Sequence, residues 1–334
     1  MLNNLNILFL TLTFSSSILA ISSSSWLGAW MGLELNMLSF VPLMIEQKNS
    51  STNEFALKYF LVQALASSMF IMLCVVNTFL FFSFSIFNSQ IFNFLVIPLM
   101  IKLGAAPFQT WFIMLMNSLN WWKALLLATW QKIAPLFILT YLNLSPVLLT
   151  MMLLISLFTG SLGGFSQTTF QKIFAFSSVT HLGWLFSSMM ASTHLLFFYF
   201  SLYIFMNTIL FLSMFLMNSF FFNQNLALNS NPSLMMGILS LSGLPPFWGF
   251  IPKWMVIQHM ILSNQMFLAF ILIASALVNL IFYVRLIINY SLLSSLSLKW
   301  LPWNYFSSSS NSTPLNLMLS MTITSLVLFN FMLF

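Results

Sequence analysis

The sequence predicts an all-α polytopic membrane protein with about eleven transmembrane helices, arranged as two inverted five-helix repeats plus a C-terminal helix. Three observations indicate this fold class. Of the 334 residues, 60% are apolar and only 4% are charged, which the surface of a soluble domain of this size does not tolerate. Apolar segments of about 20 residues, the length that crosses a bilayer, follow one another along the chain. Two of these segments are interrupted by Gly and Pro.

The first apolar segment lacks the basic residues that open a signal peptide and passes directly into a second one, so we interpret it as a membrane helix. Further segments follow, separated by short links rich in Asn, Ser and Pro. The eleven predicted spans are residues 5–22, 26–45, 56–83, 91–116, 121–141, 147–165, 170–190, 195–221, 233–262, 266–291 and 315–334.

The interruptions fall in the fourth and ninth spans, "IKLGAAPFQTW" at 101–111 and "LSGLPPFWGFIPKW" at 241–254. Proline disfavours helix in the residue before it, so we expect half-helices to end at Ala106 and Leu244. Interrupted helices at corresponding positions of two halves are typical of inverted-repeat transporters; a packing kink without function is the alternative. We expect one transmembrane domain, residues 1–334, with repeats at about 1–141 and 147–291 and a C-terminal helix at about 315–334.

The charges in the connecting segments test this topology, because eleven spans place successive connections on alternate sides. All the Lys and Arg residues in these connections fall on the side of the N-terminus. Basic residues concentrate on the cytoplasm-equivalent side, so the N-terminus is predicted to face that compartment and the C-terminus the opposite one. Glu46 and Glu54 are interpreted as surface partners of nearby lysines. The six basic residues are Lys48, Lys58, Lys123, Lys172, Arg285 and Lys299.

Four ionisable residues lie well inside predicted spans: Glu34, Lys102, Lys132 and Lys253. A charge at the bilayer centre costs at least about 2.5 kcal/mol, so such residues are retained mainly for function. Burial favours the neutral form of a lysine and a nearby carboxylate favours the charged form, so a change in their separation loads or releases a proton. This pattern predicts a proton path. A static buried ion pair and lysine snorkelling are the alternatives.

Three histidines are present, of which only His181 lies in the middle of a span. It either relays protons between Lys132 and Lys253 or is a neutral side chain bonded to a neighbouring helix. His194 and His259 are expected near the membrane surface and are given no role.

Several classes of site are excluded by what the sequence lacks. Cys74 is the single cysteine, so neither a zinc cluster nor a thiolate-ligated iron–sulfur centre is expected in this chain. The glycine-rich "TGSLGG" at 159–164 ends an apolar helix and indicates close helix packing, not a phosphate-binding loop. The net charge of +6 is too sparse for nucleic acid. We expect no metal and no cofactor in this chain.

Six segments, spread over about residues 26–290, carry a family resemblance: "WLGAWMGLELNMLSFVPLM", "EFALKYFLVQA", "IKLGAAPFQTW", "LATWQKIAP", "GSLGGFSQTTFQKIFAFSSVTHLGW" and "LSLSGLPPFWGFIPKW". Together they resemble the subunit 2 family of mitochondrial NADH:ubiquinone oxidoreductase, respiratory complex I, of animals. The resemblance implies an antiporter-like membrane-arm subunit. Its proton path would consist of a glutamate–lysine pair, Glu34 and Lys102, a central lysine, Lys132, and a distal lysine, Lys253. Two departures are Gln109, where the family often has histidine, and Lys123, interpreted as a snorkelling anchor.

The function implied is part of the proton translocation that the complex couples to electron transfer from NADH to ubiquinone, with no redox site in this chain. FMN, iron–sulfur clusters and ubiquinone are expected in other parts of the complex. The expected partners are other membrane-arm and core subunits and membrane lipids, including cardiolipin. The expected location is the mitochondrial inner membrane, with the N-terminus in the matrix and the C-terminus in the intermembrane space. The alternatives are a scaffold subunit without its own proton path and a free-standing cation/proton antiporter.

Overall fold

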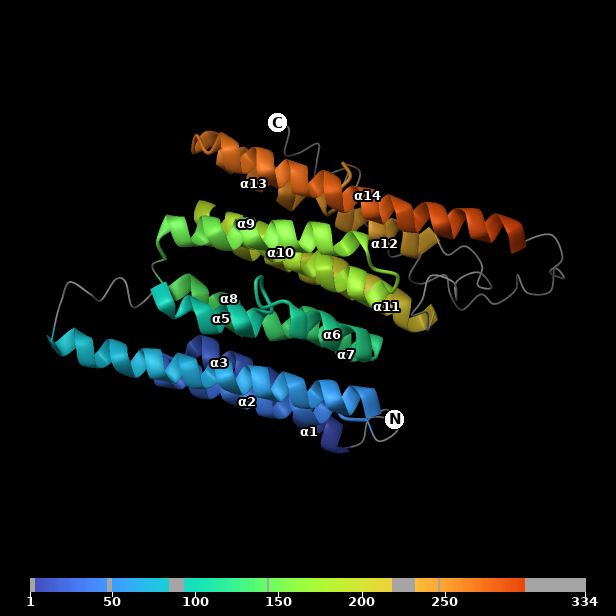
Figure 1. Cartoon of the computed structure of the whole chain (residues 1–334). Coiled ribbons are helices and arrows are strands. Elements are labelled where there is room, and N and C mark those ends of the chain that lie inside the picture. Colours follow the sequence, from blue (N-terminus) through green and yellow to red (C-terminus); the bar gives the residue numbers. More distant parts are fainter. Residues whose placement is uncertain are drawn as a thin grey trace. The chain divides into compact units, whose positions relative to one another are not determined.

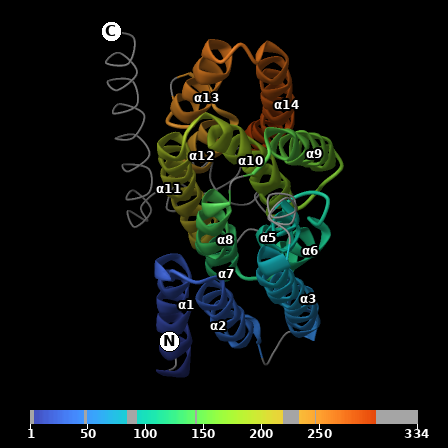
Figure 2. The same cartoon turned by 90° about the vertical axis from the view of Figure 1, so that its left-hand side faces the viewer.

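The computed structural model describes residues 4–46, 50–83, 93–142, 144–217, 232–245 and 247–297. Within these ranges every regular element is an α-helix (Figure 1). The chain divides into two compact units, Met1–Ser156 and Leu157–Phe334, each with its own packed helices. Figure 2 shows the helices of each unit close to end-on.

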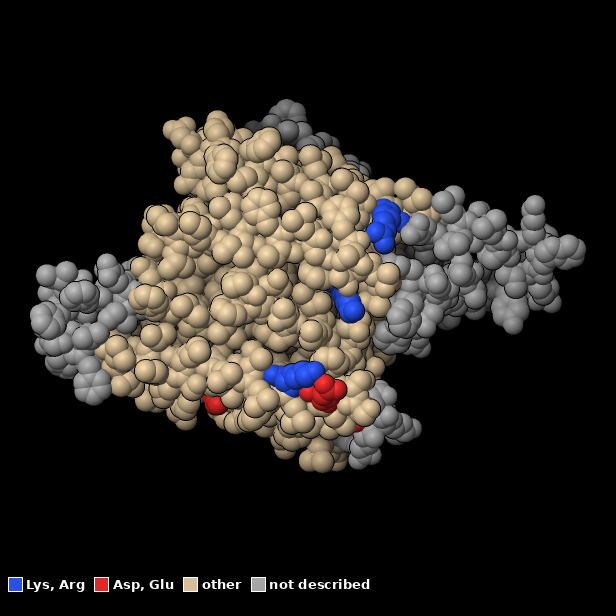
Figure 3. Space-filling model, viewed as in Figure 1, with Lys and Arg blue, Asp and Glu red and all other residues tan. Residues whose placement is uncertain are grey.

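Eight helical segments among the described residues are long and apolar enough to cross a membrane. The predicted all-α polytopic membrane class is therefore confirmed. The fourth and ninth predicted spans are missing from the eight because each is divided into shorter helices, and the predicted helix at 315–334 lies outside the described residues. The count of eleven, the inverted repeats and their boundaries stay predictions. The face in Figure 3 is largely free of charged side chains, as a lipid-facing surface requires.

The first unit is built on an antiparallel pair, α1 and α2, because the short Ser-rich turn at 23–25 allows no crossover. Gly32 permits their close approach, since a Cβ there would lie 2.6 Å from the backbone nitrogen of Ala20. Helix α8 packs on α1, α2, α5 and α7, and α3 packs on α2, α5 and α6. The helices are α1 (Asn4–Ser22), α2 (Trp26–Met44), α3 (Ser50–Ser83), α5 (Val96–Leu103), α6 (Thr110–Ser118), α7 (Trp121–Ala128) and α8 (Trp130–Tyr141).

The interruption predicted in the fourth span is confirmed, but the half-helix ends earlier than expected. Helix α5 ends at Leu103 and not at Ala106, because Gly104 adopts a left-handed conformation (φ 64°) and its N–H bonds back to the Ile101 carbonyl. The indole N–H of Trp111 in α6 also donates to that carbonyl at 3.1 Å. The Ile101 carbonyl at the break therefore accepts one bond from the backbone and one from a side chain. In an apolar environment such a freed carbonyl needs partners from the protein or from water.

A second interruption in this unit has no Gly or Pro signal. Helices α7 and α8 meet at Thr129, whose φ and ψ are −114° and −68°. Its hydroxyl donates to the Leu125 carbonyl at 2.7 Å, and its N–H donates to the same carbonyl at 3.0 Å. A side-chain bond of this kind often bends a helix. The segment 121–141 was expected to be one continuous helix and is two, with Lys132 in the first turn after the break.

The second unit is centred on α10, which packs on α11, α13 and α14 and is buried along most of its length. Helix α9 crosses the boundary between the units at residue 156. The "TGSLGG" glycines do serve close packing: a Cβ on Gly160 would lie 2.8 Å from the backbone nitrogen of Thr180, and Gly163 faces the Phe176 ring. The helices are α9 (Pro146–Phe165), α10 (Phe170–Ala191), α11 (Thr193–Met217), α12 (Pro232–Ser242), α13 (Phe250–Leu262) and α14 (Met266–Ser297).

Candidate functional site

Glu34 lies in the middle of α2, and one of its carboxylate oxygens, Oε2, is buried without a hydrogen-bond partner among the described residues. The carboxylate is near enough to Lys102 to act on it electrostatically, although the two do not form a direct ion pair. A buried carboxylate oxygen that lacks a protein donor is a place for water or for a mobile proton donor. Glu34 and Lys102 thus form no direct ion pair in the part of the chain that the structure describes, and their pairing stays a prediction.

Lys102 lies in the last turn of α5 and is only 7% exposed. The partial negative charge at a helix C-terminus stabilises a cation there, typically by 0.3–1 kcal/mol. Gly104 caps this end of the helix. A larger residue would not fit there, because a Cβ on Gly104 would lie 2.7 Å from the Cβ of Phe112 in α6. The interruption therefore places the lysine at a helix end inside the apolar unit.

Lys132 in α8 is 2% exposed, and its Nζ lies 4.9 Å from the centroid of the Phe112 ring. The ring quadrupole attracts the ammonium group in this geometry. Helix α8 packs against α5, so Lys132 and Lys102 lie on neighbouring helices. The amide of Gln131 also donates to the Asn36 side chain at 3.0 Å, which ties the helix of Lys132 to that of Glu34.

Gln109, the predicted departure from a frequent histidine of the family, lies between the two half-helices α5 and α6. Its Oε1 is buried and has no hydrogen-bond partner among the described residues. Such an amide oxygen can accept a bond from water but cannot ionise at physiological pH. The polar groups of the first interruption therefore include one unsatisfied acceptor besides the lysine.

Lys253 in α13 is 5% exposed, and its ammonium group donates to the carbonyl oxygens of Leu241 (3.0 Å) and Ser242 (2.9 Å). These carbonyls end α12, which stops at Ser242 and not at Leu244 because Gly243 takes φ 81°. The second predicted interruption is thus confirmed. Here the lysine of one half-helix closes the C-terminus of the other half, where the helix dipole favours a cation.

The Trp184 ring of α10 lies beneath Lys253, with 5.8 Å between the ring centroid and Nζ. The indole N–H of Trp184 is buried and has no partner among the described residues. Trp184 also stacks on Tyr199 of α11, with an interplanar angle of 12°. Sequence reasoning missed both aromatic residues, because nothing in an aromatic-rich helix distinguishes a ring beside a lysine from a ring beside lipid.

His181 lies one turn before Trp184 in α10 and is 3% exposed. Its Nδ1 lies 2.9 Å from the hydroxyl oxygen of Tyr199. The contact with a neighbouring helix is therefore present, and both interpretations of His181, as a proton relay or as a neutral bonded side chain, stay predictions. The ring of Tyr203 in α11 also packs against the His181 ring, and their centroids lie 5.2 Å apart.

The surface charges pair differently from the prediction in one case. Lys58 bonds Glu54 one turn away at 2.6 Å, as expected, and both are well exposed. Glu46, by contrast, pairs with Lys123 at 2.6 Å, with each side chain 21% exposed, and it accepts a bond from Asn120. Lys123 is therefore an ion-pair partner and not only a snorkelling anchor. Lys48 lies outside the described residues.

The described residues contain no group of three or more His, Cys, Asp or Glu side chains that would suit a metal ion. Each unit instead has its own set: amines, a carboxylate, an amide and an aromatic ring in the first, and an amine, a histidine and aromatic rings in the second. This set can bind, hold and transfer protons but offers no redox centre.

Comparison with known proteins gives the family. Residues 23–278 match the model of the NADH:quinone oxidoreductase/Mrp antiporter transmembrane family. The chain is 46% identical over 202 residues to NADH-ubiquinone oxidoreductase chain 2 of Anopheles gambiae and 39% identical over 202 residues to that of Locusta migratoria. These alignments cover 59% and 60% of this chain and 58% and 59% of the relatives. The chain thus spans somewhat more than half the length of the relatives that it matches.

Solved structures show the same fold. A chain of the respiratory complex I of Thermus thermophilus is 20% identical with a TM-score of 0.80, over 97% of this chain and 78% of that chain. A chain of the Mrp complex from Dietzia is 14% identical with a TM-score of 0.72, over 83% of this chain and 59% of that one. Since the family match covers more than half of the sequence, the chain belongs to the NADH:quinone oxidoreductase/Mrp antiporter transmembrane family.

Proposed function

We propose that this chain is a core membrane subunit of the mitochondrial NADH:ubiquinone oxidoreductase and carries part of its proton translocation. The single observation that supports this most strongly is the burial of three lysines at interrupted helices: Lys102, Lys132 and Lys253 are 7%, 2% and 5% exposed. Burial of a lysine inside a membrane costs several kcal/mol of insertion free energy, so such residues are retained mainly for function. The relatives named chain 2 of NADH-ubiquinone oxidoreductase support the same assignment.

In the first unit, Glu34 and Lys102 form the switch. No direct ion pair fixes their separation, so a shift of α2 or α5 can change it, and a low dielectric enlarges the effect of that change on the amine. When the carboxylate approaches, the amine holds its proton; when it withdraws, burial favours the neutral amine. Lys132, on the helix that packs against α5, receives or supplies the proton.

In the second unit, Lys253 is the distal group. Its ammonium form is held by the carbonyls of Leu241 and Ser242, and loss of the proton weakens the link between α12 and α13. His181 is a relay with Tyr199 as its bonded neighbour. Proton movement through this unit is coupled to conformational change at the α12–α13 interruption.

The chain holds no cofactor in this proposal; FMN, the iron–sulfur clusters and ubiquinone belong to other subunits, whose redox chemistry supplies the energy. Moving one charge against 100 mV costs about 2.3 kcal/mol. The partners are the other membrane-arm and core subunits and lipids of the inner membrane. The N-terminus faces the matrix and the C-terminus the intermembrane space.

The test is Lys102→Met in the assembled complex, with Lys58→Met as the control, since Lys58 is an exposed surface residue. We expect assembly and NADH oxidation with an artificial acceptor to persist in both variants, and proton translocation per NADH to fall only in Lys102→Met. An undiminished proton yield would assign the chain a scaffold role. Isolation of the chain in mild detergent without redox subunits would favour a free-standing antiporter.

A further inference from the structure

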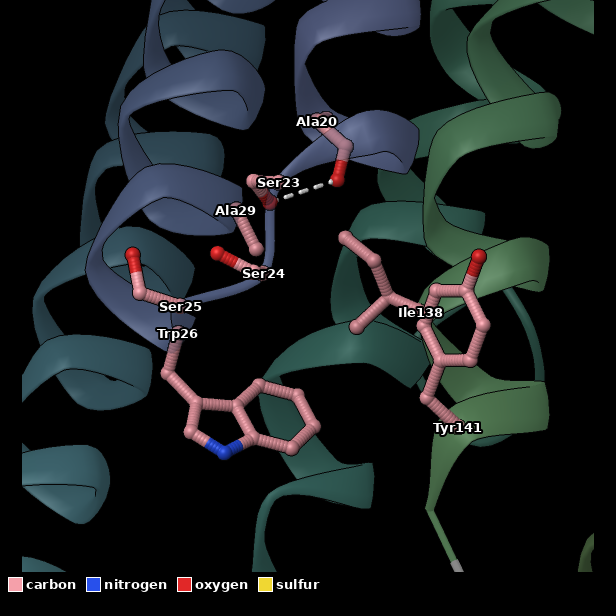
Figure 4. A pocket seen from close by; sticks show the side chains of 8 residues that line it. All are labelled: Ala20, Ser23, Ser24, Ser25, Trp26, Ala29, Ile138 and Tyr141. Atoms are coloured by element: carbon pink, nitrogen blue, oxygen red, sulfur yellow. Dashed lines mark hydrogen bonds between the residues drawn. The ribbon is translucent and has the colours of Figure 1, made fainter.

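A pocket of about 280 Å³ lies at the turn between α1 and α2, within the first unit. Trp26 and the serines of the turn form one side, and Ile138 and Tyr141 of α8 form the other (Figure 4). The pocket is too small for a drug-sized molecule and of a size for a small polar headgroup. Its complete lining is Ala20, Ser23, Ser24, Ser25, Trp26, Ala29, Ile138 and Tyr141.

The two aromatic rings are held in place by neighbours. Trp26 packs on Phe70 of α3, with ring centroids 6.4 Å apart. The Tyr141 hydroxyl donates to the Ile21 carbonyl at 3.5 Å, which directs its hydrogen-bonding group to the end of α1. Aromatic rings attract cations, and quaternary ammonium groups are the ligands that need no hydrogen bond in return.

The serines supply the polar side of the pocket. Ser25 accepts a bond from the Gly28 N–H through its oxygen, so its hydroxyl proton remains available to an acceptor. Ser23 donates to the Ala20 carbonyl, and Ser24 is exposed beside it. Hydroxyl donors suit the oxygens of a phosphate diester.

The pocket lies where three apolar helices end, α1 at Ser22, α2 from Trp26 and α8 at Tyr141. Trp and Tyr are enriched at such a level, where hydrocarbon meets headgroups. Neither the lining nor the links at 23–25 and 142–146 contain a Lys, Arg, Asp or Glu. An anionic lipid would find no cation there, and a primary ammonium group would find no carboxylate.

We infer that this pocket binds the headgroup of a zwitterionic phospholipid with a quaternary ammonium group, the phosphocholine type. The ammonium methyl groups lie between Trp26 and Tyr141 and against the small apolar side chains, and the phosphate lies at the serines. This assignment depends on the chain being embedded in a bilayer and not on proton translocation, because none of the lining residues belongs to the proposed proton path.

The experiment uses the assembled complex in phosphatidylcholine vesicles that contain a trace of phosphatidylcholine with a photoreactive group on the choline. After illumination, labelled peptides that include residues 20–29 are quantified by mass spectrometry. We expect the double variant Trp26→Leu/Tyr141→Leu to reduce labelling about tenfold, since each ring contributes a cation–π contact. Trp122→Leu, which removes a 46% exposed tryptophan elsewhere, should leave labelling unchanged.

Competition identifies the headgroup. In vesicles whose bulk lipid is phosphatidylglycerol or phosphatidylethanolamine, the trace probe should label residues 20–29 more strongly than in phosphatidylcholine vesicles, because only unlabelled phosphatidylcholine competes for the pocket. If the double variant fails to assemble, Ser24→Asp provides the same test at an exposed position, because a negative charge beside the phosphate should also reduce labelling. Unchanged labelling in the variants, or equal competition by the anionic lipid, would overturn the assignment.

Discussion

The ammonium nitrogen of Lys253 lies 2.9 Å from the carbonyl oxygen of Ser242, the last residue of α12. One side chain thereby joins the two halves of an interrupted helical segment. It donates hydrogen bonds to carbonyls at the end of α12, where the helix ladder stops. A group that both carries a charge and closes a helix end couples protonation to structure. The variants below separate these two roles from ordinary packing.

Gly243→Ala should destabilise the second unit. Gly243 has φ 81°, and a Cβ at this position would lie 2.9 Å from the Lys253 ammonium nitrogen. The left-handed conformation alone costs an alanine about 1–2 kcal/mol. We expect less complex to survive a heat step, measured by native gel electrophoresis. Gly164→Ala, in a helix with 3.2 Å to the Phe282 ring, is the matched control and should have the smaller effect.

The His181–Tyr199 bond should be measurable as a coupling energy. Both groups are buried, so loss of one leaves the other unsatisfied at a cost of about 1–3 kcal/mol. In a double-mutant cycle with His181→Ala and Tyr199→Phe, the combined loss of thermal stability should be smaller than the sum of the single losses. Strictly additive losses would show that the bond contributes nothing.

Glu34→Gln should reduce proton translocation with little loss of stability. The amide keeps the shape of the side chain but cannot ionise, and Oε2 has no hydrogen bond within the described residues to lose. We expect proton yield per NADH to fall while the assembled amount stays near that of the unmodified protein. Glu34→Asp retains a carboxylate and should keep part of the yield. Equal yields for Gln and Asp would argue against a role for the charge.

Glu46→Gln should destabilise the first unit more than Glu54→Gln. The Glu46 pair is only 21% exposed and links the end of α2 to Lys123 of α7, so its loss should cost about 1–3 kcal/mol. The Glu54–Lys58 pair is exposed within one helix and should contribute at most about 0.5 kcal/mol. Thermal inactivation of the two variants at low and high salt measures the difference.

The sequence indicates the membrane class, both interruptions and all the buried charges, because lysine and proline stand out in an apolar chain. It does not locate the helix ends at Leu103 and Ser242. In each case a glycine in the left-handed conformation ends the helix before the residue that precedes proline, where the end was predicted. The break at Thr129 carries no Gly or Pro, and the bond from its hydroxyl to the Leu125 carbonyl has no signature in the sequence.

The partners of the buried lysines are equally invisible in the sequence. Phe112 and Trp184 lie under Lys132 and Lys253 because helices from distant parts of each unit pack together. With 40 Phe and 11 Trp residues in the chain, no local pattern selects these rings. The Glu46–Lys123 pair likewise spans 77 residues. The sequence alone favours Lys48 as the partner, because it lies only two positions from Glu46.

The most direct measurement is the number of protons translocated per NADH oxidised by the assembled complex carrying Lys132→Met, the most deeply buried of the three lysines. A methionine fills similar volume but cannot take up a proton. We predict that NADH oxidation with an artificial acceptor persists and that fewer protons cross the membrane for each NADH. A proton yield equal to that of the unmodified complex would contradict the proposal that these amines carry protons.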